Sequence, residues 1–275
     1  MKDSNTPPNF VHPDAKIGNN VFISPFTYID QDVEIGDGTW IGPNVTIFEG
    51  ARIGKDCRIF PGAVISAIPQ DLKFHGEKTY AIIGDRTNVR EFVTINRGTQ
   101  AAGKTVIGND CLLMAYAHVA HDCVLGDRVI LANNVNLAGH VEIEDWAILE
   151  GLVAVQQFIR IGAHAFVAGG SLVRKNVPPY IRAAREPLTY IGINHVGLTR
   201  RAFTTEQINL IKEIYHVIFV KGYNTTNALN VVEQQFSDSP EKETILTFIR
   251  QSELAKVKGI VKGMGQLNGS NVYED

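Results

Sequence analysis

The sequence predicts a mainly β fold, a parallel β-helix followed by a small α-helical domain. The first observation is a sixfold register: from Val11 to Val173, every sixth residue is Val, Ile or Leu at 25 of 28 positions. This period is neither the 2 of an amphipathic strand nor the 3.6 of a helix, so it indicates a repeat. The second observation is a change to helical spacing after Pro178-Pro179. We therefore divide the chain into residues 1–180 and residues 181–275.

A hexad of this kind is typical of a short strand that ends in a tight corner. One residue points inward, and Gly often follows it, as at Gly18, Gly36 and Gly54. Gly or Asn would supply the positive φ that corners need. Three corners close a triangle, so one coil takes 18 residues and successive coils stack as parallel strands about 4.8 Å apart. The register from 11 to 173 accommodates about nine such coils.

The register is broken only at Asp71, Glu77 and Ala101. A lone carboxylate cannot replace an inward aliphatic side chain without a burial cost of several kcal/mol, so these positions mark excursions from the stack. We expect protruding loops near 67–80 and near 99–104. Because loops can project from a solenoid without disturbing it, they are the expected places for function.

The second domain contains three predicted helices. Thr204 and Gln207 form a capping box ahead of an apolar stripe that begins at Ile208. Ser239 is the expected N-cap of another helix, with Pro240 in its first turn. A third helix is expected from about 226 to 236. The Gly-, Asn- and Ser-containing tail, 259–275, is expected to be loose.

Composition excludes several classes of protein. The formal net charge of −3 argues against a general nucleic-acid binder, which needs a basic surface. The N-terminus has no apolar segment of a secretory signal, and no run approaches 18 apolar residues, so we expect a cytoplasmic chain without membrane insertion. Cys57, Cys111 and Cys123 share one hexad position, which predicts inward packing rather than a disulfide or a cysteine zinc site.

Residues 18 apart should lie one above another, which gives a geometric test for a site. His121, Gly139 and Gln157 form one such column, and Asp122, His140 and Phe158 form the next, with His118 half a hexad earlier. A neutral histidine can act as a general base near pH 7. Asp122 follows His121 directly, so on a strand it should point to the opposite side. Which carboxylate orients His121 is therefore open, with Asp71 as a second candidate.

Residues 10 to 180 resemble the hexapeptide-repeat, left-handed parallel β-helix family of acyltransferases, and the left hand is implied by that resemblance. Longer motifs are similar to those of the UDP-N-acetylglucosamine O-acyltransferase family over nearly the whole chain. They are PQDLK (69–73), GDRTNVREFVTINRGT (84–99), AHVAHDC (117–123), ILANNVNLAGHV (130–141), VPPY (177–180) and GLTRR (197–201). The resemblance implies the first step of lipid A biosynthesis: a long 3-hydroxyacyl chain passes from acyl carrier protein to the 3-hydroxyl of UDP-N-acetylglucosamine.

The resemblance also implies roles for individual residues. His121 would be the general base, the backbone N–H of Gly139 would stabilise the oxyanion, and Asp122 completes the catalytic set. The substrate-binding residues would be Gln70, Asp71, Lys73, His118, His140, Gln157, Asn194, Arg200 and Arg201. A homotrimer with sites between subunits is implied, and neither a metal nor another cofactor is expected. An acidic carrier protein would dock on basic residues, for which Lys256, Lys258, Lys262 and Arg200 are candidates.

Gly169 lies where this family measures acyl length, so its lack of a side chain predicts a long acyl substrate. Three positions depart from the familiar enterobacterial pattern, namely Gln156, Val196 and Asn96. The first two lie on the nucleotide side and leave room for a different substrate. An alternative is therefore N-acylation of a 3-amino analogue of the UDP-sugar.

A different class of enzyme also fits part of the pattern. Trimeric β-helical carbonic anhydrases of the γ type bind zinc through three histidines, and His118, His121 and His140 could imitate that set. The long loop at 67–80 and the GLTRR segment have no use in that reaction. A third class, a non-catalytic or ice-binding solenoid, would show regular Thr faces, which this sequence lacks.

Overall fold

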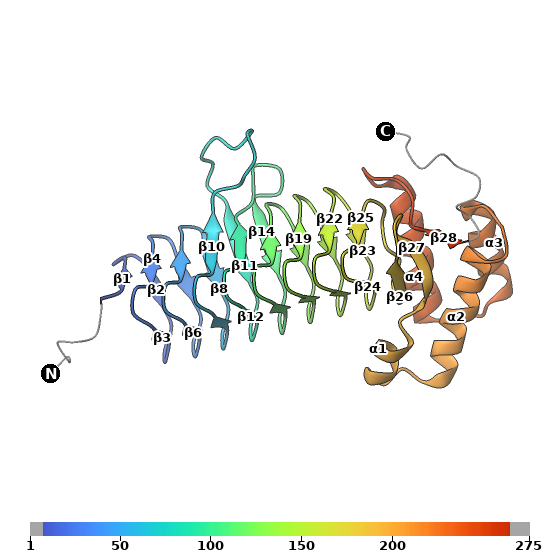
Figure 1. Cartoon of the computed structure of the whole chain (residues 1–275), viewed down its shortest axis with the longest axis horizontal. Coiled ribbons are helices and arrows are strands. Elements are labelled where there is room, and N and C mark those ends of the chain that lie inside the picture. The colour runs from blue at the N-terminus through green and yellow to red at the C-terminus, as the bar shows by residue number, and fades with distance from the viewer. Residues whose placement is uncertain (1–7, 265–275) are drawn as a thin grey trace.

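The structure is a computed structural model that describes residues 8–264. The chain winds through three sheets, parallel throughout the coils, that form the sides of a triangular prism (Figure 1). We name them sheet A, with nine strands, sheet B, with eight, and sheet C, with eleven. In the uninterrupted coils the paired strands are 18 residues apart, as in the pairing of Asn136 with Ala154. The predicted left-handed parallel β-helix with a C-terminal helical domain is confirmed.

The strands are short because each side of the triangle is only one hexad long. Sheet A contains β1 (Phe10–Val11), β4 (Tyr28–Ile29), β7 (Thr46–Ile47), β10 (Val64–Ala67), β13 (Thr94–Asn96), β16 (His118–Val119), β19 (Asn136–Leu137), β22 (Ala154–Val155) and β25 (Leu172–Val173). Sheet B contains β2 (Lys16–Ile17), β5 (Glu34–Ile35), β8 (Ala51–Ile53), β11 (Tyr80–Ile83), β14 (Lys104–Ile107), β17 (Val124–Leu125), β20 (Glu142–Ile143) and β23 (Arg160–Ile161). Sheet C contains β3 (Phe22–Ile23), β6 (Trp40–Ile41), β9 (Arg58–Ile59), β12 (Asn88–Val89), β15 (Leu112–Leu113), β18 (Ile130–Leu131), β21 (Ile148–Leu149), β24 (Phe166–Val167), β26 (Ile181–Ala184), β27 (Thr189–Ile193) and β28 (Lys262–Gly263).

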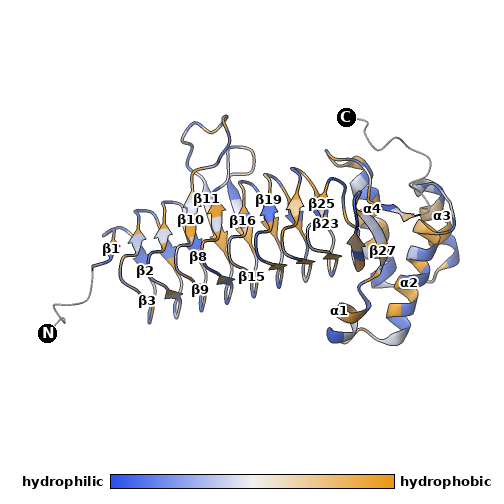
Figure 2. Cartoon of the chain, in the orientation of Figure 1, coloured by the Kyte–Doolittle hydropathy of each residue, from blue (hydrophilic) through white to orange (hydrophobic). Residues whose placement is uncertain are grey.

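The sixfold aliphatic register fills the interior of the prism. Its members from Ile29 to Val173 are at most 4 % exposed, and each stacks on Ile, Leu or Val of the neighbouring coils, as Ile95 does on Val119. Burying one such side chain contributes roughly 1.5–3 kcal/mol, so the stack rather than any single strand holds the coil together. Outward positions are mixed, so the strands in Figure 2 range from orange to blue.

The corners differ from the expectation in one respect. The glycine after the inward residue does not supply the positive φ. A Cβ on Gly36 would lie 2.6 Å from the carbonyl carbon of Gly54 in the next coil, so glycine is needed there for close stacking. Positive φ occurs two residues later, at Gly38 (71°), and at corresponding corner positions such as Asn20 (56°) and Trp146 (63°).

The helical domain begins later than the sequence suggested. Residues 181–193 were expected to begin the helical region, but β26 and β27 pair antiparallel and extend sheet C. Side chains of the helices then pack on this hairpin, so its apolar residues contact both the prism and the helices. The buried Tyr215 donates a hydrogen bond to the carbonyl of Pro179 at 2.6 Å and ties helix to prism.

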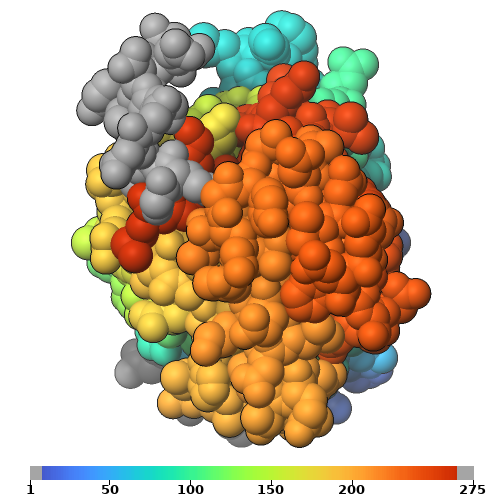
Figure 3. Space-filling view, turned by 90° about the vertical axis from the view of Figure 1, so that its right-hand side faces the viewer, coloured from blue at the N-terminus to red at the C-terminus, as the bar shows by residue number. Residues whose placement is uncertain are grey.

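Four helices follow the hairpin and cover the end of the prism, as the orange surface in Figure 3 shows. They are α1 (His195–Arg200), α2 (Thr205–Phe219), α3 (Thr225–Gln235) and α4 (Pro240–Leu254). The capping box of Thr204 and Gln207 and the Ser239 N-cap are confirmed. Within residues 8–264, no helix has the length and apolar character needed to cross a membrane.

The expected loose tail is ordered over its first part. β28 pairs with β27, and Val261 is buried. The Asn176 side chain donates to the carbonyls of Val257 (2.8 Å) and Gly259 (2.9 Å), so two loop carbonyls are satisfied from the prism. The expectation was therefore wrong for residues 259–264, and residues 265–275 lie outside the described part.

The three cysteines point inward, as predicted, and are free thiols. Burial raises the pKa of Cys57 and Cys111 to about 11 and that of Cys123 to about 12. Because the thiolate is the reactive form, these groups act as packing residues.

Candidate active site

Both loops and the histidine columns lie along one edge of the prism, where the chain turns from sheet A to sheet B. We call it the A/B edge. The first loop, 68–79, connects β10 to β11, and the second, 97–103, connects β13 to β14. The next turns along this edge carry His121-Asp122, Gly139-His140 and Gln157-Phe158. The loops project from the prism there (Figure 1). The 18-residue columns thus place the histidines beside the loop that was expected to bind substrate.

A cleft of about 940 Å³ lies between the loops and these turns. Its walls are Gln70, Asp71, Leu72, Lys73, Glu77, Thr99, Gln100, Ala101, His121, His140, Gln157, Phe158 and Lys256. Six predicted substrate or catalytic residues are therefore brought together. Polar side chains from the loop face the histidines across an open volume that can hold a sugar nucleotide.

His121 is oriented by Asp122, contrary to the strand-based expectation. Its Nδ1 lies 2.8 Å from Asp122 Oδ2, whereas Asp71 Oδ2 lies 4.0 Å from Nε2. The alternation of a strand does not apply, because Asp122 is a corner residue with a φ of 60°. The left-handed corner turns its side chain back toward His121. Asp122 therefore accepts a hydrogen bond from Nδ1–H of His121, and Nε2 faces the cleft.

The carboxylate of Asp122 is fully buried and accepts two further hydrogen bonds, from Thr99 N (2.9 Å) and Thr99 Oγ1 (2.6 Å). Burial alone would raise the pKa of Asp122. The hydrogen bonds from Thr99 and His121 outweigh it and hold that pKa below its usual value. Asp122 thus stays ionised at neutral pH, which favours the Nδ1–H tautomer of His121.

Gly139 lies directly beside the His121 ring. A Cβ at this position would approach His121 Cε1 to 2.5 Å and Nε2 to 2.7 Å. The carbonyl of Gly139 accepts from Phe158 N, while its N–H has no acceptor within residues 8–264. Glycine therefore both makes room for the imidazole and leaves a backbone donor free beside it.

The other two histidines of the group have different surroundings. His140 stacks on Phe158 with ring centroids 4.5 Å apart, and its edge contacts the His121 ring. Burial lowers the pKa of His140, and the nearby His121 and Lys256 lower it further against the pull of Asp122. His118 lies on sheet A with Nδ1 2.7 Å from Thr94 Oγ1, and it does not line the cleft.

The remaining predicted residues lie on other edges of the same chain. The Asn194 side chain donates to the carbonyl of His164, and the Arg201 guanidinium lies over Trp146, both at the turns from sheet B to sheet C. Arg200 precedes Arg201 with an exposed side chain. Gly169 lies at a turn from sheet C to sheet A. One chain alone does not bring these residues to His121.

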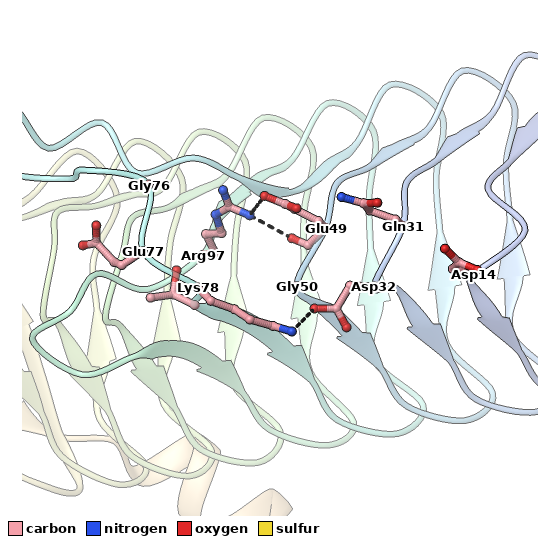
Figure 4. A pocket seen from close by; sticks show the side chains of 10 residues that line it. Asp14, Gln31, Asp32, Glu49, Gly50, Gly76, Glu77, Lys78 and Arg97 are labelled. Atoms are coloured by element: carbon pink, nitrogen blue, oxygen red, sulfur yellow. Dashed lines mark hydrogen bonds and ion pairs between the residues drawn. The ribbon is translucent and has the colours of Figure 1, made fainter.

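Another hollow, of about 520 Å³, lies on the A/B edge on the N-terminal side of the first loop (Figure 4). Four of its charged residues form two ion pairs: Arg97 bonds Glu49 at 2.8 Å, and Lys78 lies 3.1 Å from Asp32. These pairs fasten the loop to the prism. We interpret this hollow as structural support for the neighbouring cleft.

Among the described residues, one group could hold a metal ion. Ligand atoms of His121, Asp122 and His140 all lie within 4.8 Å of one another. This is not the set of three histidines that a γ-type carbonic anhydrase would use, because His118 bonds Thr94 instead. Asp122 already accepts three hydrogen bonds, so its oxygens are committed to orienting His121.

Comparison with known proteins identifies the family of the chain. A family model described as UDP N-acetylglucosamine O-acyltransferase, domain 2, matches residues 176–261, and bacterial transferase hexapeptide repeats match 14–49, 32–67 and 104–139. An acyl-[acyl-carrier-protein]--UDP-N-acetylglucosamine O-acyltransferase of Janthinobacterium is 46 % identical over 72 % of this chain and 76 % of its own. The chain belongs to the UDP-N-acetylglucosamine O-acyltransferase family.

Solved structures of this family extend the match to the helical end. A UDP-N-acetylglucosamine acyltransferase from Bacteroides fragilis superposes with a TM-score of 0.91 at 49 % identity, covering 94 % of this chain and 99 % of the other. The enzyme from Francisella novicida gives 0.89 at 37 % identity, covering 97 % and 98 %. The likeness to these UDP-N-acetylglucosamine O-acyltransferases thus includes both domains.

Sequence reasoning missed two residues of the site. Thr99 binds Asp122 with both its backbone and its hydroxyl, and the signal available was its place in the interrupted segment beside the lost aliphatic residue at 101. Lys256 was assigned to a docking surface, but it lines the cleft. No local pattern places it there, because it lies about 100 residues after Phe158 in the chain.

Proposed function

We propose that this chain, as a cytoplasmic homotrimer, transfers a long 3-hydroxyacyl chain from acyl carrier protein to the 3-hydroxyl of UDP-N-acetylglucosamine, the first step of lipid A biosynthesis. The observation that carries the proposal is the pair His121 and Asp122: Nδ1 is held at 2.8 Å by a buried carboxylate, and Nε2 faces the cleft. Such a pair provides an oriented general base, because the carboxylate fixes the imidazole ring with Nε2 toward the cleft.

The reaction follows from the positions of these atoms. His121 Nε2 takes the proton of the sugar 3-hydroxyl as its oxygen attacks the thioester carbonyl. The negative charge that develops on the carbonyl oxygen is stabilised by the N–H of Gly139, which has no hydrogen-bond acceptor within the described part of the chain. The tetrahedral intermediate then collapses, the carbon–sulfur bond breaks, and the imidazolium returns its proton to the departing thiolate.

Substrate positioning would be shared between the loop and the edge. Gln70, Asp71 and Lys73 would bind the sugar from the loop, opposite His140 and Gln157, with His118 supporting the group from sheet A. Asn194, Arg200 and Arg201 would bind the nucleotide of a site on a neighbouring subunit, since in their own chain they lie on another edge. A trimer would thereby complete each site.

The function is tested by mixing the protein with UDP-N-acetylglucosamine and 3-hydroxyacyl carrier proteins, with and without a chelator. We expect O-acylated product, unchanged in rate by the chelator, because His121 and Gly139 need no metal to act. Transfer confined to the 3-amino sugar would instead support the N-acylating alternative. Zinc-dependent hydration of carbon dioxide without acyl transfer would support the carbonic anhydrase alternative.

Gly169 gives a prediction about acyl length. An acyl chain whose thioester carbonyl lies at His121 would cross sheet A, about 20 Å for six residues at about 3.3 Å each, and would also pass three coils along the prism, about 14 Å, to reach Gly169. At this position φ is not left-handed, but an added Cβ would lie 3.1 Å from the carbonyl oxygen of Gly151, so a side chain fits only if that backbone shifts by a few tenths of an ångström. In Gly169→Met we expect the preferred acyl chain to shorten by several carbons, with at least a tenfold change in relative kcat/KM.

The measurement is competition among carrier proteins charged with graded acyl chains. Gly170→Ala is not a useful control, because Gly170 has a φ of 70° that alanine would strain. The control is Leu172→Ala, which removes an exposed side chain on the neighbouring strand and does not obstruct the acyl path. An unchanged length profile in Gly169→Met would contradict the assigned path.

A further inference from the structure

Lys256 lies at the boundary between two hollows. Its Nζ is 3.6 Å from the centroid of the Phe158 ring, which itself stacks on His140. Lys256, His140 and Phe158 line both the cleft and an adjoining hollow of about 590 Å³, which the end of α4 closes. The C-terminal segment therefore delivers a cation to the side of the cleft opposite the loop.

The backbone on both sides of Lys256 is fixed. Gly259 N donates to the carbonyl of Ser252, which is buried on α4. Asn176 binds the carbonyls of Val257 and Gly259 from the prism. Holding the backbone lowers the entropy that the side chain loses when it binds a ligand.

No carboxylate within residues 8–264 forms an ion pair with the ammonium of Lys256. Four acids line the two hollows. Glu77 accepts from the backbone of His75 and Gln100, and Glu142 pairs with Arg160. Asp122 is bonded to Thr99 and His121, and Asp71 lies 4.0 Å from His121 Nε2. A lysine that rests on an aromatic face keeps its hydrogen-bond donors available.

We propose that Lys256 is a substrate-binding residue that contacts a phosphate group at the boundary of the two hollows. The proposal rests on the proposed function, in which both co-substrates carry phosphate: the diphosphate of the sugar nucleotide and the phosphodiester of the acyl carrier arm. A compact ammonium suits phosphate as a point charge. Docking on the acidic surface of the carrier protein is a separate hypothesis, and the test distinguishes it.

The test compares Lys256→Gln and Lys256→Arg with Lys55→Gln, an exposed lysine on a distant edge that serves as the charge-matched control. KM and kcat are measured for each co-substrate, and the affinities of UDP and of uridine are measured by calorimetry. We expect Lys256→Gln to raise one KM about tenfold, a typical loss for one charge-assisted contact, with kcat within twofold. Lys256→Arg should recover most of the loss, and Lys55→Gln should match the unaltered protein.

The pattern of KM changes identifies which phosphate Lys256 contacts. A raised KM for UDP-N-acetylglucosamine with weaker UDP but unchanged uridine binding assigns Lys256 to the nucleotide diphosphate. A raised KM for both acyl carrier protein and a free acyl-phosphopantetheine assigns it to the carrier arm. A raised KM for the carrier protein but not for the free arm would replace the proposal with surface docking. Both KM values within twofold of the unaltered protein would overturn it, while an unaltered protein without acyl transfer would refute the proposed function itself.

Discussion

Replacing His121 with alanine is expected to reduce kcat about a thousandfold while leaving the KM for the sugar nucleotide within a few-fold. The physical reason is that no other imidazole can take over the proton. The ring of His140 is stacked on Phe158, and burial lowers its pKa, which makes it a weaker base. His118 is bonded to Thr94 and does not line the cleft. General base catalysis contributes typically 10²–10⁴-fold. The measurement is steady-state transfer with both co-substrates varied.

Asp122→Asn separates orientation from proton transfer. An amide keeps the shape but can present its NH₂ group to Nδ1, which favours the wrong tautomer of His121, and the loss of kcat should approach that of His121→Ala. Thermal melting of both variants checks that a loss of activity does not come from unfolding. Near-full turnover in His121→Ala would refute the general-base assignment, whatever the behaviour of Asp122→Asn.

The second large effect is expected in mixed trimers. His121 lies on the A/B edge, while Arg200 and Arg201 lie at the turns between sheets B and C, so each site would combine two chains. His121→Ala trimers and Arg200→Ala Arg201→Ala trimers should each be nearly inactive at low sugar-nucleotide concentration. Unfolded together and reassembled in equal amounts, they should recover about a quarter of the unaltered activity, the statistical share of sites with both intact edges.

A matched mixture provides the control. His121→Ala combined with Asp122→Asn should recover nothing, because both residues belong to the same edge of the same chain, so no site in the mixture has the intact pair. Mass spectrometry of the intact assemblies shows whether the chains exchange. Verified exchange without any recovery in the first mixture would mean that one chain supplies the whole site.

The repeat made the architecture predictable at the level of single residues. An inward aliphatic side chain every six positions leaves one packing solution, so the coil length, the buried ladder and the columns of His121 and His140 all follow from counting. The loops were predictable for the same reason, since Asp71 and Glu77 cannot face that interior. The helix starts followed from local capping chemistry at Thr204 and Ser239.

Other parts depended on information that counting does not contain. The orientation of Asp122 depends on its left-handed corner, where the strand rule fails. The sequence predicts helical structure for 181–193, whereas the chain forms a hairpin there, because its apolar residues serve both the sheet and the helices. Lys256 reaches Phe158 only through the tertiary path of the C-terminal segment, which Asn176 fixes from a distance of about 80 residues in the chain.

The separation of interior and edge also governs how such a protein can change. The aliphatic ladder sets stability and is indifferent to what the corners carry, whereas the A/B edge holds both loops and the histidine pair. A whole coil duplicated before the first loop would lengthen the prism and leave the cleft as it is. The same duplication after His121 would move Lys256 away from the loop by about 4.8 Å, the spacing of one strand. The number of coils between His121 and the C-terminal segment therefore sets the width of the cleft, and it can change without repacking of the core.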